Sequence, residues 1–373
     1  MKPTVLQILP ELDCGGVERG TIDVAAELVR RGYRSMVVSG PGRLVPQLIS
    51  DGSEHFNMLV GKKSIFSATT LIPKLHRLFK EQPIDIIHAR SRLPAWLAYL
   101  AWKKLDPNNR PAFVTTVHGP YSVNRYSKIM TVGERIIAVS EYIKDYILVN
   151  YPEVDEKRIE VIHRGISKQD YPYKYNPPAE WLNNWKFLHP NLNEKFIITL
   201  PGRITRWKGH NDFIEIITKA KNNGLNVHGL IAGGAGPKKE KYLQELKSII
   251  AKNNMADHFT FLGHRDDMKN VMSISNIVLS LARIPEAFGR TALEALFLGV
   301  PVIAYDHGGG GEVLAGIFPE GKSKPLCTNN VVSLITQFYN TKPNVPDRNC
   351  FTLDIMLNKT ISVYDSLIKM RTI

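Results

Sequence analysis

Short apolar runs alternate with amphipathic stretches along most of this chain. Residues 5–9 (VLQIL) form one such run and end at Pro10, which favours a buried first strand. The stretch from Thr21 to Arg31 has the apolar spacing of a helix and ends at Gly32. Strands that alternate with helices in this way predict an α/β fold with parallel, doubly wound sheets. Further strands are predicted in the first half at 35–39, 85–89, 112–117, 135–140 and 160–163.

The alternation resumes in the second half, with predicted strands at 196–200, 227–232, 259–262, 277–282 and 302–305. Between the halves, residues 168–195 carry four prolines and three tyrosines and show no clean period. Such a break is typical of an interdomain linker, here with a short helix around Trp181 and Trp185. We therefore expect a first domain at 1–170, a linker at 171–194 and a second domain at 195–352, followed by an amphipathic helix at about 353–373.

The composition is that of an ordinary globular protein, with 43% apolar and 22% charged residues among 373. That length favours two domains over a single core. The three cysteines, Cys14, Cys327 and Cys350, have neither metal-ligand nor disulfide-framework spacing, which predicts a reducing compartment. The N-terminal apolar run is too short for a signal peptide, and no run reaches the ~18 apolar residues of a membrane span. We therefore expect a cytoplasmic protein.

The formal net charge is +13, and both halves share the excess. A basic surface suits nucleic acid, an anionic membrane face or phosphorylated substrates. The basic residues are scattered and form no basic helix or aromatic-interleaved patch, so we expect no nucleic-acid partner. Peripheral association with an anionic membrane surface stays open.

Two carboxylates lie around the start of a predicted helix, in the stretch PEAFGRTALEALFLGVP at residues 285–301. The helix from Thr291 to Val300 is apolar on nearly every side, so Glu294 needs a partner there. Glu286 lies eight residues earlier in a loop bounded by Pro and Gly, where it could accept hydrogen bonds from a hydroxyl-rich ligand. The alternative is that Glu294 pairs with Arg290 and that Glu286 is solvated.

Two cations follow the first strand of the second half, in the loop GRITRWKG at residues 202–209. Arg203 and Lys208 lie five residues apart, so both could neutralise a diphosphate at the end of the strand. A solvated basic loop is the alternative. Downstream, the four glycines at 308–311 could form an anion-binding cradle or a flexible turn.

Further candidate binding residues follow predicted strands of the first half. Gly15-Gly16 could let a backbone approach a phosphate or could form a plain tight turn. Arg90 and Arg92 could bind an anionic acceptor with their guanidinium forks or could lie in a solvated turn. His118 could simply cap the end of its strand. It could also belong to a ligand site, because ligands of parallel sheets collect at the carboxyl ends of the strands.

Together, the Gly-Gly loop, the His-Gly strand end, G-R-x4-K-G and Glu-x7-Glu resemble the signature of retaining GT-B glycosyltransferases of family 4, the glycosyl transferases group 1. The resemblance covers most of the chain. It implies two Rossmann-like domains that face each other across a cleft, with acceptor binding in the first domain and nucleotide-sugar binding in the second. It also implies that the helix at 353–373 packs back on the first domain.

The resemblance assigns roles to individual residues. Glu286 and the backbone of Phe288 and Gly289 would contact the donor sugar, and Glu294 would hold the nucleotide ribose. Arg203 and Lys208 would hold the diphosphate, and His118 would lie beside the donor sugar and the acceptor. The remaining donor contacts would come from Gly16, Gly234, Leu262 and His264.

The implied reaction is transfer of a hexosyl group from a nucleotide diphosphate sugar, with retention at the anomeric carbon. The chain has no strict Asp-x-Asp motif, so we expect neither a metal nor another cofactor. The stretch IIHARSRLPAW at 86–96 resembles bacterial lipopolysaccharide core glycosyltransferases, including mannosyltransferases, and implies a lipid-linked, anionic glycan acceptor. An epimerase or phosphorylase on the same fold, or a non-catalytic subunit that binds sugar nucleotides, remains an alternative.

Overall fold

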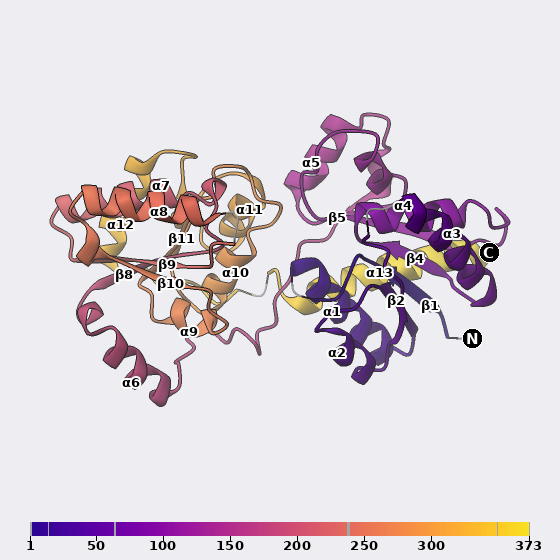
Figure 1. Ribbon diagram of the computed structural model, residues 1–373, viewed down its shortest axis with the longest axis horizontal. Coiled ribbons are helices and arrows are strands. Elements are labelled where there is room, and N and C mark those ends of the chain that lie inside the picture. Colours follow the sequence, from indigo (N-terminus) through magenta and orange to yellow (C-terminus); the bar gives the residue numbers. More distant parts are fainter. Residues whose placement is uncertain (1, 14, 63–64, 237–238, 349, 373) are drawn as a thin grey trace. The chain divides into compact units, whose positions relative to one another are not determined.

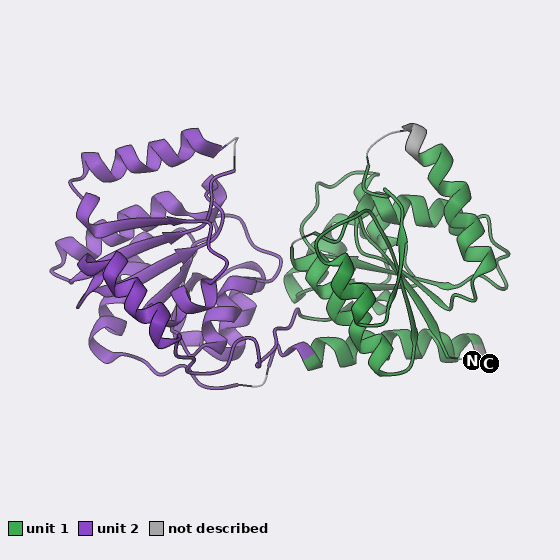
Figure 2. Cartoon of the chain, turned by 60° about the horizontal axis from the view of Figure 1, so that its bottom comes forward, with its two compact units in different colours: residues 1–163, 354–373 green, residues 164–353 purple. Residues whose placement is uncertain are grey.

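The computed structural model describes residues 2–13, 15–62, 65–236, 239–348 and 350–372. The chain divides into two compact units, which Figure 2 colours separately. Unit 1 comprises residues 1–163 and 354–373, and unit 2 comprises residues 164–353. Each unit is described here by itself. Among the described residues, no helix combines the length and apolar character needed to cross a membrane.

Unit 1 contains a parallel sheet of seven strands in the order β3-β2-β1-β4-β5-β6-β7. In chain order the strands are β1 (Thr4–Ile8), β2 (Arg34–Ser39), β3 (Glu54–Asn57), β4 (Ile86–Ala89), β5 (Ala112–Val117), β6 (Arg135–Ala138) and β7 (Ile159–Val161). The helices are α1 (Gly16–Arg30), α2 (Val45–Ser50), α3 (Ile65–Glu81), α4 (Arg92–Trp102), α5 (Glu141–Asn150) and α13 (Leu353–Thr372).

Helices lie on both faces of this sheet, with α1, α2 and α13 on one side and α3 and α4 on the other (Figure 1). The central strands β1, β4 and β5 are therefore buried along their whole length, which explains their apolar sequences. Helix α13 contributes Tyr364, whose hydroxyl lies 2.6 Å from Nδ1 of His88 in the sheet.

Unit 2 contains a parallel sheet of six strands in the order β10-β9-β8-β11-β12-β13. Its strands are β8 (Phe196–Pro201), β9 (Val227–Ala232), β10 (Phe259–Gly263), β11 (Ile277–Ser280), β12 (Val302–Tyr305) and β13 (Lys322–Ser323). Its helices are α6 (Ala179–Leu188), α7 (His210–Asn222), α8 (Glu240–Lys252), α9 (Met268–Ser273), α10 (Arg290–Phe297), α11 (Gly308–Ile317) and α12 (Thr328–Thr341).

The segment before β8, which we expected to be a linker, packs on unit 2. Its helix α6 places Trp185 in a cluster with Leu230 of β9 and Val271 of α9, and only 6% of Trp185 is exposed. The indole N–H of Trp181 donates to Asp267 at 2.6 Å.

The two parallel sheets confirm the predicted α/β class. The sequence pattern missed β3 and β13, because these short strands lie at sheet edges, where a long apolar run is not needed. In unit 1 the order of strands reverses between β1 and β4, and in unit 2 it reverses between β8 and β11. Ligands of doubly wound sheets bind at the carboxyl ends of the strands beside such a reversal.

Candidate active site

The loops after β8 and β11 flank the strand-order reversal of unit 2, and they carry the central charged residues of the predicted donor site. Lys208 of the first loop forms an ion pair with Glu286 of the second. The two side chains are only 20% and 15% exposed, so solvent screens the pair weakly. The ammonium of Lys208 also lies 4.5 Å from the ring centroid of Trp207. The alternative of a solvated Glu286 is therefore wrong.

Arg203 lies in the same loop as Lys208 but has a different environment. Its side chain is exposed, and no carboxylate within the described residues lies at ion-pair distance from it. The neighbouring Ile204 donates its backbone N–H to the carbonyl of Gly234 at 3.1 Å. The loops after β8 and β9 are thereby tied together, while the guanidinium of Arg203 stays available to an anion.

Glu294 lies on α10, whose apolar residues are buried as predicted. Its side chain is 14% exposed and accepts a hydrogen bond of 2.8 Å from Nε of Arg290. The i,i+4 pair that the sequence left open is thus present. Burial, together with the nearby carboxylate of Glu294, raises the pKa of Tyr171, a neighbour that the sequence pattern did not reveal.

The four glycines after β12 form the first turn of α11, so they are not a flexible turn. Binding of an anion by the N–H groups of this turn stays a prediction. A Cβ atom on Gly309 would lie 2.3 Å from Cα of Phe288. The backbone N–H of Gly309 donates to the carbonyl of Glu286 at 2.8 Å. Gly308 has a φ of 57°, which glycine adopts without strain. The glycines thus let α11 start directly against the backbone from Glu286 to Gly289.

The remaining predicted donor contacts of unit 2, Gly234, Leu262 and His264, lie at the carboxyl ends of β9 and β10. Leu262 of β10 packs against the cluster that contains Trp185, while His264 is exposed, with its Nε2 3.2 Å from Oδ1 of Asp266. Gly234 follows β9, next to His264: a Cβ on Gly234 would lie 3.5 Å from Cβ of His264. The predicted donor residues of unit 2 therefore lie on the side of the sheet where the carboxyl ends of its parallel strands lie.

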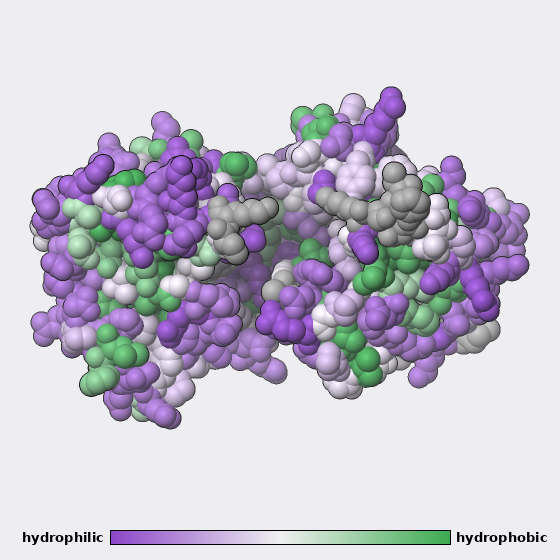
Figure 3. Space-filling model, in the orientation of Figure 1, coloured by the Kyte–Doolittle hydropathy of each residue, from purple (hydrophilic) through white to green (hydrophobic). Residues whose placement is uncertain are grey.

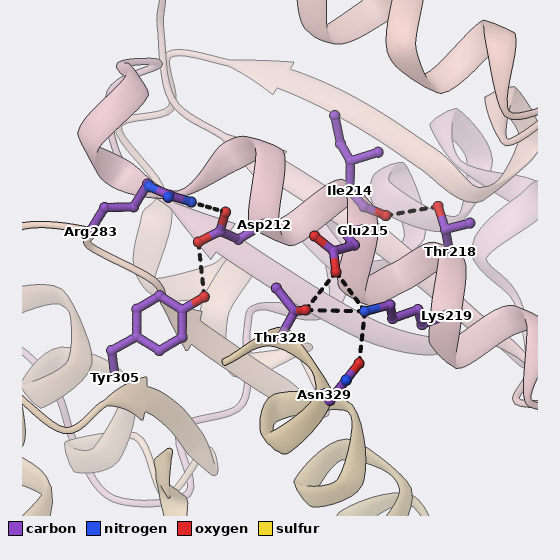
Figure 4. A network of polar contacts seen from close by, with 9 residues as sticks. All are labelled: Asp212, Ile214, Glu215, Thr218, Lys219, Arg283, Tyr305, Thr328 and Asn329. Atoms are coloured by element: carbon purple, nitrogen blue, oxygen red, sulfur yellow. Dashed lines mark hydrogen bonds and ion pairs between the residues drawn. The ribbon is translucent and has the colours of Figure 1, made fainter. Parts of the chain in front are cut away.

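Three residues that support this side of the sheet were not identified from the sequence. Arg283 follows β11 and forms an ion pair with Asp212 of α7, and Tyr305 of β12 donates its hydroxyl to the same carboxylate at 2.9 Å (Figure 4). Asp212 is 5% exposed. Asp212 lies at the polar start of α7 and gives no distinct sequence signal, because its partners are distant in sequence.

In unit 1, the candidate residues lie after the adjacent strands β1, β4 and β5. Gly16 is the first residue of α1 and is exposed. Arg90 is only 3% exposed, and its Nη1 donates to Oε1 of Gln7 at 2.7 Å. Burial lowers the pKa of Arg90. Arg90 is thus part of the core, and Arg92 is the accessible arginine of the two.

Arg92 lies between two tyrosine rings. Its guanidinium carbon is 4.6 Å from the ring centroid of Tyr121 and 5.4 Å from that of Tyr126, and Nη1 donates to Oγ of Ser127 at 3.2 Å. The backbone N–H of His118 donates to the hydroxyl of Tyr121 at 3.3 Å. Tyr121 therefore contacts both of these candidate residues, so the structure brings Arg92 and His118 into one neighbourhood.

Family models match both units. Residues 14–170 match Glycosyltransferase Family 4, and residues 183–318 match Glycosyl transferases group 1. The chain is 30% identical to a glycosyltransferase of Rickettsia africae ESF-5 of known structure, with a TM-score of 0.85 and 99% of each chain covered.

More distant similarities agree with the fold. Anabaena Alr3699/HepE, solved in complex with UDP and glucose, is 18% identical with a TM-score of 0.73, and 99% of this chain and 97% of that chain are covered. The lipopolysaccharide core biosynthesis mannosyltransferase LpsB of Rhizobium meliloti is 28% identical over 42% of this chain and 43% of its own length. Two Bacillus subtilis relatives are matched over 61% and 64% of their lengths. The chain belongs to the glycosyltransferases of the GT-B fold that combine a Glycosyltransferase Family 4 domain with a Glycosyl transferases group 1 domain.

Proposed function

We propose that this glycosyltransferase moves a hexosyl group from a nucleotide diphosphate sugar to an anionic glycan or lipid-linked acceptor, with retention at the anomeric carbon. The observation that carries the proposal is the weakly exposed Lys208–Glu286 pair at the strand-order reversal of unit 2. A nucleotide diphosphate sugar presents phosphate oxygens and sugar hydroxyls, which such a pair of opposite charges can bind together.

The proposed chemistry depends on charge that develops as the diphosphate leaves. The ammonium of Lys208 and the guanidinium of Arg203 oppose the growing negative charge, and they are positioned before the reaction begins. Glu286 accepts hydrogen bonds from the sugar hydroxyls and thereby orients the sugar. Glu294 holds the ribose. In this proposal the two cations do the work of a metal, so the reaction needs no metal ion.

We assign the acceptor to unit 1, where Arg92 and His118 share Tyr121 as a neighbour. In the described part of the chain, no carboxylate lies at ion-pair distance from Arg92, so its charge can meet an acidic group of the acceptor. The similarity to LpsB supports a role in lipopolysaccharide core or other cell-envelope polysaccharide synthesis. The same similarity favours a mannosyl donor.

Peripheral binding to an anionic membrane from the cytoplasmic side would bring the enzyme to a lipid-linked acceptor. The net charge of +13 supports it, and the face in Figure 3 is largely hydrophilic with only small groups of hydrophobic residues. Binding through charge must weaken as salt rises. Vesicles with anionic lipid should therefore lose the protein at high salt, and binding that ignores ionic strength would contradict this part of the proposal.

The central experiment has two stages. Thermal-shift measurements with UDP, GDP, ADP and their sugars should identify one nucleotide that stabilises the protein, because binding to the native state raises its stability. Incubation of the matching labelled nucleotide sugar with lipid-linked oligosaccharides should then yield an extended glycan. A protein that binds the donor but never extends an acceptor would be a non-catalytic subunit, and conversion of the sugar itself would indicate an epimerase.

A further inference from the structure

The loop that carries Glu286 is attached to its surroundings through three of its own backbone groups. The N–H of Arg283 donates to the carbonyl of Trp207 at 2.7 Å. Nε2 of His307 lies 2.7 Å from the carbonyl oxygen of Ala282, and the carbonyl of Glu286 accepts the N–H of Gly309 at 2.8 Å. These contacts hold the loop against the segment of Lys208 on one side and against the start of α11 on the other.

A fourth attachment uses side chains. The guanidinium of Arg283 binds Oδ1 of Asp212, and Oδ2 of the same carboxylate accepts the hydroxyl of Tyr305 at 2.9 Å (Figure 4). The side chain of Asp212 is 7% exposed, whereas that of Arg283 is 46% exposed. Burial and the contact with Asp212 raise the pKa of Tyr305, so its hydroxyl keeps the proton that it donates. Both carboxylate oxygens of Asp212 are therefore engaged.

Asp212 lies close in sequence to the other member of the charge pair. Helix α7 begins at His210, immediately after Lys208 and Gly209. Gly209 has a φ of 78°, and a side chain there would lie 2.1 Å from the carbonyl oxygen of Leu281. The start of α7 thus touches the end of β11. Through Arg283, Asp212 links the element that follows Lys208 to the loop that carries Glu286.

Stability by itself does not account for this arrangement. An ion pair with one half-exposed partner contributes little net stability, because desolvation of the buried charge and ordering of the side chains offset the attraction. The same helix also offers a comparison, since Glu215 lies one turn later and binds Lys219 and Thr328 (Figure 4). Glu215 joins α7 to α12, whereas Asp212 joins α7 to the Glu286 loop.

We propose that Asp212, held by Tyr305, is a positioning residue for Glu286 and acts through Arg283. The inference rests on the proposed contact between Glu286 and the donor sugar. Asp212 fixes the distance between Lys208 and Glu286, so the sugar is oriented relative to the diphosphate. The proposed contacts of Arg203 with the diphosphate and of Glu294 with the ribose do not depend on this link. Loss of Asp212 should therefore impair the sugar step and leave nucleotide binding intact.

The experiment compares Asp212→Asn and Tyr305→Phe with the matched control Glu215→Gln, all in the full-length protein. The donor is the nucleotide sugar found in the thermal-shift screen, and the readouts are turnover at saturating donor, KM for the donor and Kd for the free nucleoside diphosphate. Asp212→Asn should lower turnover about 10- to 100-fold, because misplaced groups lose orientation. Tyr305→Phe should lower turnover less than Asp212→Asn does. Glu215→Gln should keep wild-type turnover, even if its melting temperature falls as much as that of Asp212→Asn.

Two further variants separate positioning from a general loss of structure. Asp212→Glu should recover part of the turnover, since it restores the carboxylate. Arg283→Gln and Asp212→Asn together should lose no more than the worse single variant, because both break one contact. Turnover of Asp212→Asn equal to that of Glu215→Gln, or strictly multiplicative losses in the double variant, would overturn the inference. If Glu286→Ala itself keeps full turnover, the proposed role of Glu286 fails instead.

Discussion

Both sheets carry their candidate residues at the carboxyl ends of the strands, which we call the carboxyl edge, but the charges there differ. In unit 2, the carboxylates beside the strand-order reversal each meet a cation, in the pairs Lys208–Glu286, Arg290–Glu294 and Arg283–Asp212. In unit 1, the accessible Arg92 meets tyrosine rings and a serine hydroxyl. A ligand with both hydroxyls and phosphates matches the first edge, and a simple anion matches the second. Under the proposed function, the first edge would bind the donor and the second would bind the acceptor.

Replacing Glu286 tests the first edge most strongly. Glu286→Ala should lower turnover about 100- to 1,000-fold, as expected for a group that acts mainly in the transition state. Nucleotide affinity should stay close to that of the wild type, because the diphosphate and ribose contacts remain. Steady-state kinetics and calorimetry with the free nucleotide measure the two effects. Glu245→Ala is a suitable control, since that carboxylate pairs with the exposed Arg206. Equal turnover in both variants would remove Glu286 from the reaction.

Glu294 should affect binding instead. Glu294→Ala should weaken nucleotide binding about 10- to 100-fold, because a charged hydrogen-bond acceptor contributes roughly 1.5–3 kcal/mol. The wild type should bind the ribonucleotide more tightly than the deoxyribonucleotide, and the variant should lose that preference. Titration calorimetry with both nucleotides is the measurement. A variant that retains the preference would show that another group reads the ribose.

The second edge is tested at Arg92. Arg92→Gln should lower turnover about 10-fold with a phosphorylated or carboxylated acceptor, since it loses a charge-assisted contact. A neutral acceptor of the same sugar should be unaffected, and so should hydrolysis of the donor. Arg125→Gln changes an exposed arginine of the same segment and should resemble the wild type. Equal losses with charged and neutral acceptors would argue against an anion site.

Low pH should reduce the stability of unit 2 through His210, the first residue of α7. Burial lowers the pKa of His210 from 6.5 to about 4, so the folded state keeps this ring neutral while the unfolded state protonates it. The contribution of the neutral His210 ring to the free energy of unfolding is complete above 6.5, its pKa in the unfolded state. This contribution is lost as the pH falls toward about 4, the pKa in the folded state. Between about pH 8 and about pH 5, the loss should be on the order of 2 kcal/mol. Denaturant unfolding of wild type and His210→Gln should show this difference, and parallel pH profiles would contradict it.

Much of the candidate site was predictable from short patterns. Glu286 lies in the loop before α10 and Glu294 lies one turn into that helix, while Arg203 and Lys208 share one loop, so both spacings are visible in the sequence. The paired partners were not visible. Lys208 and Glu286 are 78 residues apart, and Arg283 and Asp212 are 71 apart. Such contacts depend on which strands become neighbours.

The sequence by itself determined the α/β class, the two sheets and the family, because strand and helix periods and the order of motifs are local properties. Only the tertiary structure decided that Arg90 is in the core while Arg92 is accessible, although the two are two residues apart. It also decided that the four glycines after β12 begin a helix against the Glu286 loop. The physical reason is that burial and pairing are set by packing between distant segments, which no local pattern records.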